Sequence, residues 1–202
     1  MERSPDGYAY LVAHGSRTSS EHLGWCSGDG VFLARTRPSP ETVNDPAAWE
    51  FAAGTEPVSE EIRVIRNGPL RWTRDVTAAR PIVSWPGHVG CVTVTRLASG
   101  RYLMCVTDGW PGIKEMDSYV LEAETLSGPW RMVAFMERFG RQAYFLNVPS
   151  RFVAPDERRF WLAYSANFAE TFLPVRIEAD PPGSGYGLCL LEVALLPAET
   201  AT

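Results

Sequence analysis

Side chains able to bind a polar substrate recur beside the turns of this sequence. Asp108 stands in the stretch Thr107-Asp108-Gly109-Trp110, and Asp117 begins an apolar run. Carboxylates accept hydrogen bonds from hydroxyl groups, imidazoles and amides donate or accept them, and aromatic rings stack on apolar C–H surfaces. The other candidates at comparable positions are His14, Asp29, His88, Trp110, Tyr144, Asn147 and Asn167. Together these residue types suit a pocket for a polyol.

The elements that must position these residues repeat along the chain. Three aromatic-rich apolar runs, each preceded by a turn with Gly, Pro or Asp, cover Tyr8–Gly15, Tyr102–Gly109 and Phe160–Asn167. A run that follows such a turn is typical of the second strand of a β-hairpin. We expect the first strand at Cys91–Leu97 and at Val148–Val153 in the later copies, whereas in the first copy it would fall before Met1.

Further strands complete each repeat. A third strand is expected at Asp29–Arg35, Asp117–Ala123 and Tyr186–Glu192, and an outer fourth strand at Trp49–Ala53 and Trp130–Ala134. Repeated units of four antiparallel strands are typical of β-propeller blades. We therefore predict an all-β chain forming about three blades of one partial, N-terminally truncated propeller, with units at 1–56, 82–137 and 142–196. A β-sandwich is the alternative, although it does not account for the repeat. Helical signal is confined to 59–66.

This topology would bring the candidate residues to one face. The start of the first strand, the end of the second and the start of the third meet at one end of a blade, so these positions converge around the central channel. There we expect Asp108 and Asp117 as acids and the other candidates as substrate ligands. Each also has a structural interpretation: Asp29 and Asp117 as strand caps, Asp108 as an Asx-turn residue, and His14 and His88 as hydrogen-bonding core residues.

Composition excludes several other classes of protein. The net charge of −5 and the absence of a Lys/Arg cluster argue against nucleic-acid binding. No apolar run reaches the roughly 18 residues of a membrane span. The four cysteines are widely spaced without a CxxC pair, so we expect buried free thiols and neither a metal nor another cofactor. We expect a cytoplasmic protein if Met1 is its true start, and a secreted one if the chain is truncated.

The turn Ser127-Gly128-Pro129-Trp130, after the strand Tyr119–Ala123, resembles a turn of five-bladed propeller glycoside hydrolases of the arabinanase/xylosidase kind. The runs Val31–Arg35 and Phe160–Ser165 are similar in kind, and the chain resembles the C-terminal part of such proteins. The resemblance implies carboxylates that project into a central channel, one donating a proton to the leaving oxygen and another activating water or attacking the sugar. It also implies that the general base lies on a strand before Met1.

The strand starts that are present depart from this family pattern. They carry His88 or Val89 and Leu146 or Asn147 in place of acids. The resemblance implies a carbohydrate-active, glycoside hydrolase-like propeller, and the departure favours the alternative of a non-catalytic carbohydrate-binding or scaffold propeller. The expected partner is a carbohydrate, and open blade edges would allow self-association.

Overall fold

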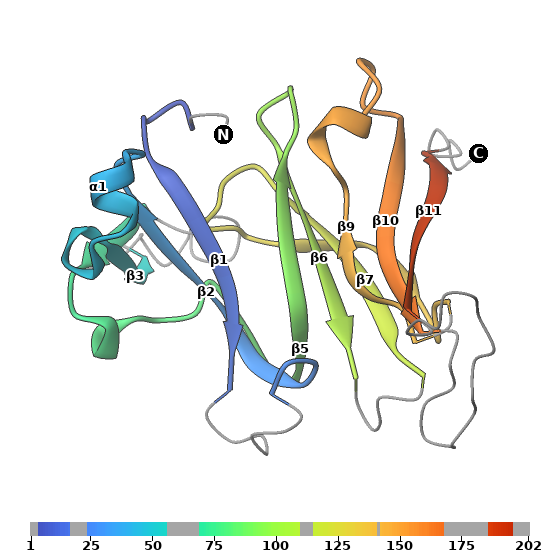
Figure 1. Cartoon of the computed structure of the whole chain (residues 1–202), viewed down its shortest axis with the longest axis horizontal. Coiled ribbons are helices and arrows are strands. Elements are labelled where there is room, and N and C mark those ends of the chain that lie inside the picture. Colours follow the sequence, from blue (N-terminus) through green and yellow to red (C-terminus); the bar gives the residue numbers. More distant parts are fainter. Residues whose placement is uncertain are drawn as a thin grey trace, which may run out of the picture.

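The computed structural model describes residues 4–16, 24–55, 69–109, 115–140, 142–167 and 186–195. Its fold is mostly β and antiparallel, with one sheet of eight strands and one of three. Along the longest axis, β1–β3 lie towards one end, β5 and β6 near the centre, and β9–β11 towards the other end, where β7 overlaps them in this view (Figure 1). The strands are β1 Ala9–Gly15, β2 Gly28–Thr36, β3 Glu50–Thr55, β4 Leu70–Thr73, β5 Val83–Arg96, β6 Tyr102–Asp108, β7 Asp117–Ala123, β8 Arg131–Met136, β9 Tyr144–Asn147, β10 Arg159–Asn167 and β11 Tyr186–Ala194. The short helices are α1 Pro40–Val43 and the 3-10 turns Pro46–Ala48, Val76–Ala78 and Ser150–Phe152.

The middle group confirms the expected sequence of four strands. β5 to β8 form a meander in which each strand pairs antiparallel with the next. The turn between β5 and β6 is closed by the Leu97 amide, which donates to the Arg101 carbonyl, and contains Gly100 at φ 93°. A left-handed φ of this kind suits glycine because glycine has no Cβ.

β5 belongs to two groups of strands at once. Its first residues pair with β2, at Val83–Val31 and Ser84–Gly30, while its later residues pair with β6. Between these parts the strand bends at Pro86-Gly87, where Gly87 has a φ of 79°. The first two predicted units therefore share one continuous sheet.

The predicted alignment of the first apolar run with the second is wrong by one residue. β1 and β6 each have seven residues, and Gly15 pairs with Gly30 where Asp108 pairs with Asp117. The counterpart of Asp108 is therefore Gly15 and not His14. Because successive strand residues point to opposite sides of a sheet, a shift of one residue exchanges the two faces.

The last group contains a second correction. The strand predicted at Val148–Val153 lies earlier, as β9 at Tyr144–Asn147, and a 3-10 turn at Ser150–Phe152 follows it. Pro149 explains the difference, because a proline has no N–H to donate to a sheet. Val153 forms only an isolated bridge, with Phe160.

The three groups of strands pack together through two apolar cores, one at each junction. One contains Val31 of β2 with Met104 and Val106 of β6, and the other contains Cys105 of β6 with Leu162 of β10. The part of the eight-stranded sheet formed by β5–β8 is called the middle sheet below. Its central strands β6 and β7 bury both faces, with alternate residues of β6 contributing to the two cores. Each fully buried large apolar side chain contributes about 1.5–3 kcal/mol to folding.

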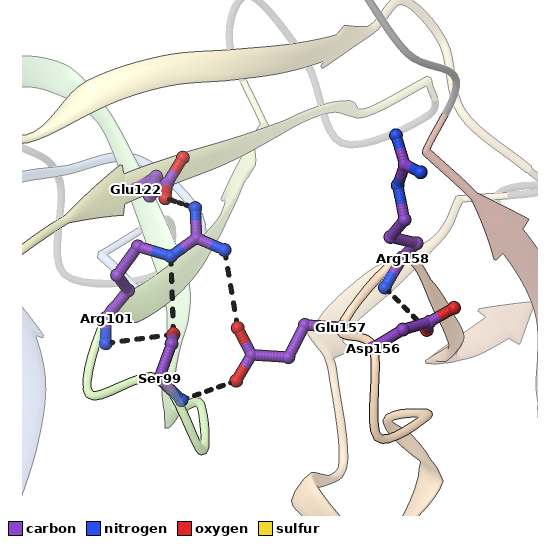
Figure 2. A network of polar contacts seen from close by, with 6 residues as sticks. All are labelled: Ser99, Arg101, Glu122, Asp156, Glu157 and Arg158. Carbon is purple, nitrogen blue, oxygen red and sulfur yellow. Dashed lines mark hydrogen bonds and ion pairs between the residues drawn. The ribbon is translucent and has the colours of Figure 1, made fainter.

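Polar contacts reinforce the junction between the middle and last groups. The hydroxyl groups of Thr93 and Thr95 on β5 donate to the carbonyls of Leu146 and Val148, at 2.5 and 2.6 Å. At the turn end of the strands, Arg101 forms ion pairs with Glu122 of β7 and, at 3.3 Å, with Glu157 of the turn before β10. Figure 2 shows that Ser99 completes this network, since its amide donates to Glu157 and its hydroxyl accepts from Arg101.

Candidate functional site

The end of the middle sheet opposite this network holds a contact between a buried carboxyl group and a partly exposed imidazole. Asp108 is the last residue of β6, and its Oδ2 lies 2.6 Å from Nδ1 of His88 on β5. The Asp108 side chain is 2% exposed and that of His88 is 34% exposed. The sequence predicts both residues as part of the site, and the structure brings them into direct contact.

This contact fixes what each group can do. A carboxylate only accepts hydrogen bonds, so Nδ1 of His88 carries the proton and donates it to Asp108. In the neutral ring Nε2 is then an acceptor, and within the described residues it has no hydrogen-bond partner. His88 is thus an oriented imidazole whose second nitrogen is able to accept a proton or a hydroxyl hydrogen bond.

Two aromatic rings frame the pair. The Trp85 ring stacks on His88 with centroids 5.2 Å apart, and Tyr119 meets Trp85 edge-on at 4.7 Å. The Tyr119 hydroxyl lies 3.5 Å from Oδ2 of Asp108, at the long limit of a hydrogen bond. Burial first, and then the charges of Asp108 and Asp117, raise the pKa of Tyr119 to about 12, so this phenol remains a donor at neutral pH. Sequence reasoning missed Trp85 and Tyr119 because no turn marks either position.

A turn at residues 24–27 crosses the middle of β5, where its pairing with β6 begins, and the end of β6. The Gly109 amide donates to the Cys26 carbonyl at 2.9 Å, and the Cys91 amide donates to the Trp25 carbonyl at 3.2 Å. A Cβ at Gly90 would lie 2.3 Å from Cα of Cys26, and one at Gly109 would lie 2.6 Å from its Sγ. The two glycines therefore let the turn lie directly on these strands.

His14 holds the same turn in place. Its pKa is lowered mainly by burial and partly restored by hydrogen bonds to the backbone of Gly24 and Trp25. On β1 it stands opposite Val31, on the face that packs against the middle sheet. The structure thus places His14 in the support of the site, in agreement with its interpretation as a hydrogen-bonding residue.

Asp29 supports the site from its other side. Its Oδ1 accepts the Gly87 amide at 3.0 Å, and its Oδ2 accepts the Ser16 hydroxyl at 3.3 Å. Gly87 is the bend of β5 and directly precedes His88. Asp29 therefore fixes the backbone that carries the imidazole.

Asp117 lies next to Asp108 on the neighbouring strand. The two residues are register partners on β6 and β7, and such pairs have Cβ atoms about 4.5–5.5 Å apart. Asp117 Oδ1 accepts the Arg138 amide at 2.7 Å, beyond the end of β8. Asp117 thus accepts a backbone amide, as expected of a strand cap, and it also stands beside the candidate acid Asp108.

Of the remaining predicted residues, one lies beside the site and one lies away from it. Tyr144 of β9 packs edge-on against Trp25 with centroids 5.7 Å apart, so it lies beside the crossing turn. Asn147 does not reach this end, because it lines a recess with Val94 and Arg96. Asn147 follows Leu146, whose carbonyl accepts a hydrogen bond from the Thr93 hydroxyl. Thr93 pairs with Cys105, so this contact lies away from the end of β6 at Asp108. Asn167 ends β10, and both its side chain and all of Trp110 lie outside the described residues.

The cysteines near the site are not reactive nucleophiles. Burial raises the pKa of Cys26 to about 11, with a further contribution from Asp108, and raises those of Cys91 and Cys105 to about 12. These three thiols are buried and free, as predicted, whereas Cys189 is half-buried. Cys105 pairs with Thr93 and not with Cys91, so the two cysteines of this hairpin are not opposite each other. The described residues contain no cluster of three potential metal ligands.

Comparison with known proteins gives no relative: no family model matches the sequence, and no curated protein is similar to it. Within the described residues, every helix is too short to cross a membrane.

Proposed function

We propose that this chain is part of a carbohydrate-active β-propeller and that it binds a saccharide where His88 of β5 meets the end of β6. The observation that carries the proposal is the contact between His88 and Asp108. It presents an oriented imidazole at the surface, backed by a buried carboxylate and stacked on Trp85. Sugar hydroxyls need groups of this kind, because each hydroxyl both donates and accepts a hydrogen bond.

The aromatic residues around the pair suit the apolar side of a sugar ring. Trp25 is 37% exposed beside Tyr144, and Phe145 extends the same cluster at 5.3 Å from Tyr144. Through the crossing turn, Trp25 is tied to Cys91 of β5 and through Cys26 to Gly109 at the end of β6. A saccharide bound there would have polar contacts at His88 and stacking contacts at Trp25.

The arrangement of the strands supports the propeller. A four-stranded meander at β5–β8, with its central strands buried on both faces, is what adjacent blades require. The division into units at 1–56, 82–137 and 142–196 and the relationship to five-bladed propeller glycoside hydrolases remain predictions.

Hydrolysis of a glycoside is the second candidate. It is favoured by Asp108 and Asp117 standing opposite each other, since glycoside hydrolysis uses two carboxyl groups. In this scheme Nε2 of His88 accepts a proton from the water that attacks the anomeric carbon and delivers it to the leaving oxygen as the glycosidic C–O bond breaks, while the buried Asp108 stabilises the transient imidazolium and Asp117 adjusts the charge of the pair.

Binding of arabinan and xylan oligosaccharides, measured by titration calorimetry, tests the proposal. We expect His88→Gln to weaken binding roughly tenfold or more, because it removes a hydrogen bond to an oriented ring. Asp156→Asn is the matched control, since its carboxylate contacts only the Arg158 amide among the described residues, in a turn at the other end of the strands. Equal affinity of His88→Gln and the wild type, with both folded, would contradict the assignment of the site.

Product release from the same oligosaccharides separates the two candidate functions. If the chain hydrolyses them, Asp108→Asn is expected to abolish turnover while preserving the fold. Binding without any product selects the non-catalytic function. Retained turnover in Asp108→Asn would remove Asp108 from the mechanism.

A further inference from the structure

The two ends of the strand array carry exposed apolar faces. At one end Leu11 of β1, which is 54% exposed, lies with Phe32 of β2 and Phe51 of β3; we call these three residues the β1 end face. At the other end Leu188 and Leu190 of β11 are 76% and 49% exposed, and Trp161 of β10 is 40% exposed; these form the β11 end face. Figure 1 shows β1 and β11 on opposite sides of the central strands.

The β11 end face is a single side of the last sheet. Trp161 stands opposite Glu192, and Ala163 opposite Leu190, so these residues share one face. The other face of β10 carries Phe160 and Leu162, which are buried against the middle sheet. The exposed residues therefore point away from the rest of the described structure.

The β1 end face is the corresponding outer side of the first sheet. The strand register equates Leu11 with Met104 and Phe32 with Tyr119, because Gly15 matches Asp108 and Gly30 matches Asp117. Met104 and Tyr119 pack against the preceding group of strands. Leu11 and Phe32 thus occupy positions that elsewhere in this molecule are covered by a preceding sheet.

Both interior junctions follow one rule. Each group of strands has one face towards the group before it in the sequence, the backward side, and one towards the group after it, the forward side. The forward side of one group packs on the backward side of the next, first between β2 and β6 and then between β6 and β10. The β11 end face is a forward side and the β1 end face is a backward side. The two faces are therefore of the kinds that pack together in the interior of the same molecule.

Shape and charge at the β1 end face are compatible with such a contact. A cavity of about 760 Å³ is lined there by Leu11, Phe32, Phe51 and Pro81, with Arg80 and Asp29 among its polar residues. The β11 end face also carries Glu192, which stands opposite Trp161, and Arg159, which lies two residues before Trp161 on the same side of β10. Each face thus has one acid and one base, so neither has an excess of charge that would oppose docking.

We propose that a second copy of this chain docks its β11 end face on the β1 end face of the first, continuing the interior packing from one molecule to the next. Two such junctions, related by a twofold axis, close a dimer in which both end faces of each copy are buried. The proposal concerns the end faces alone and does not depend on saccharide binding.

Sedimentation equilibrium of the 202-residue chain tests the association. We expect a mass of twice 22.4 kDa for the wild type. Leu11→Asp and Leu188→Asp should each weaken dimerisation about 10- to 100-fold, because each places a charge in an apolar contact. Val133→Asp is the matched control, since Val133 lies on β8, is similarly exposed, and belongs to neither end face. Circular dichroism and thermal unfolding check that all variants fold.

A mixing experiment identifies which faces meet. A heterodimer of Leu11→Asp and Leu188→Asp has one junction made of two unaltered faces, so the mixture should dimerise more tightly than either variant alone. Pairing of β11 with β11 of the second copy would instead leave Leu11→Asp fully dimeric, and mixing would rescue nothing. That result, or a wild-type monomer at the highest soluble concentration, would overturn the proposal.

Discussion

Gly90 and Gly109 show how closely single residues control the candidate site. Each lies against Cys26, and the turn that contains Cys26 joins the strands on which His88 and Asp108 stand. A side chain at either glycine would overlap this turn. The glycines are therefore part of the site although neither carries a functional group.

Replacement of Gly90 tests this view. Gly90→Ala should lower the free energy of unfolding by about 3 kcal/mol or more, because its Cβ would overlap backbone and not the end of a flexible side chain. Urea unfolding measures the loss. In the control Gly54→Ala the nearest atom to the new Cβ is 3.6 Å away, so only the conformational cost of a φ of 94°, about 1 kcal/mol, is expected. Equal losses in the two variants would show that the turn does not press on Gly90.

The pH dependence of stability tests the position of His14. Burial lowers its pKa from 6.5 in the folded state, so the unfolded chain binds more protons at mildly acid pH. The stabilising contribution is therefore complete above 6.5 and is lost as the pH falls from there towards the folded-state pKa. His14→Gln should show a smaller fall in unfolding free energy between about pH 7.5 and 5.5 than the wild type. Parallel pH profiles for the two proteins would mean that His14 is not buried as a neutral ring.

At the scale of elements, the hairpin repeats were readable from the sequence because their turns are marked by Gly, Pro and Asp. The runs predicted at 117–123 and 160–167 correspond to β7 and β10. The predicted start of the third group at Val148 was wrong because apolar residues alone do not reveal where Pro149 interrupts backbone pairing. The strand β4 was missed because its alternation of apolar and polar residues extends over only four positions.

Registers were harder to predict than strands. The sequence aligned His14 with Asp108 on the basis of similar aromatic runs, whereas hydrogen-bonded pairing aligns Gly15 with Asp108. The residues of the site were thus predicted as a set, but their individual contacts were not. That Asp108 would bind His88, and that Asp29 would bind the Gly87 amide, depends on the bend of β5, which a sequence pattern does not reveal.

The network around Arg101 gives a prediction at the same scale. Arg101→Met should reduce the free energy of unfolding by about 1 kcal/mol or less, because the side chain is partly exposed and solvent screens its two ion pairs. Urea unfolding of Arg101→Met, Glu157→Gln and the double variant should give losses that do not add, since the residues share one interaction. Arg138→Met is the control, because its pair with Glu115 is more exposed. Strict additivity of the two single losses would contradict an energetic connection between the turns.

At the scale of the whole molecule, β5 determines how the parts depend on one another. It completes the edge of β2 and begins the meander with β6, so neither of these regions can lose its backbone pairing without freeing part of the same strand. The last group, in contrast, forms a sheet of its own and meets the middle sheet through side-chain packing, the two threonine hydroxyl groups and the contacts of Glu157 with Ser99 and Arg101. The eight-stranded sheet is therefore expected to melt as one cooperative body. Any partly unfolded form of this protein would first release β9–β11, and with them the Tyr144 side of the candidate site.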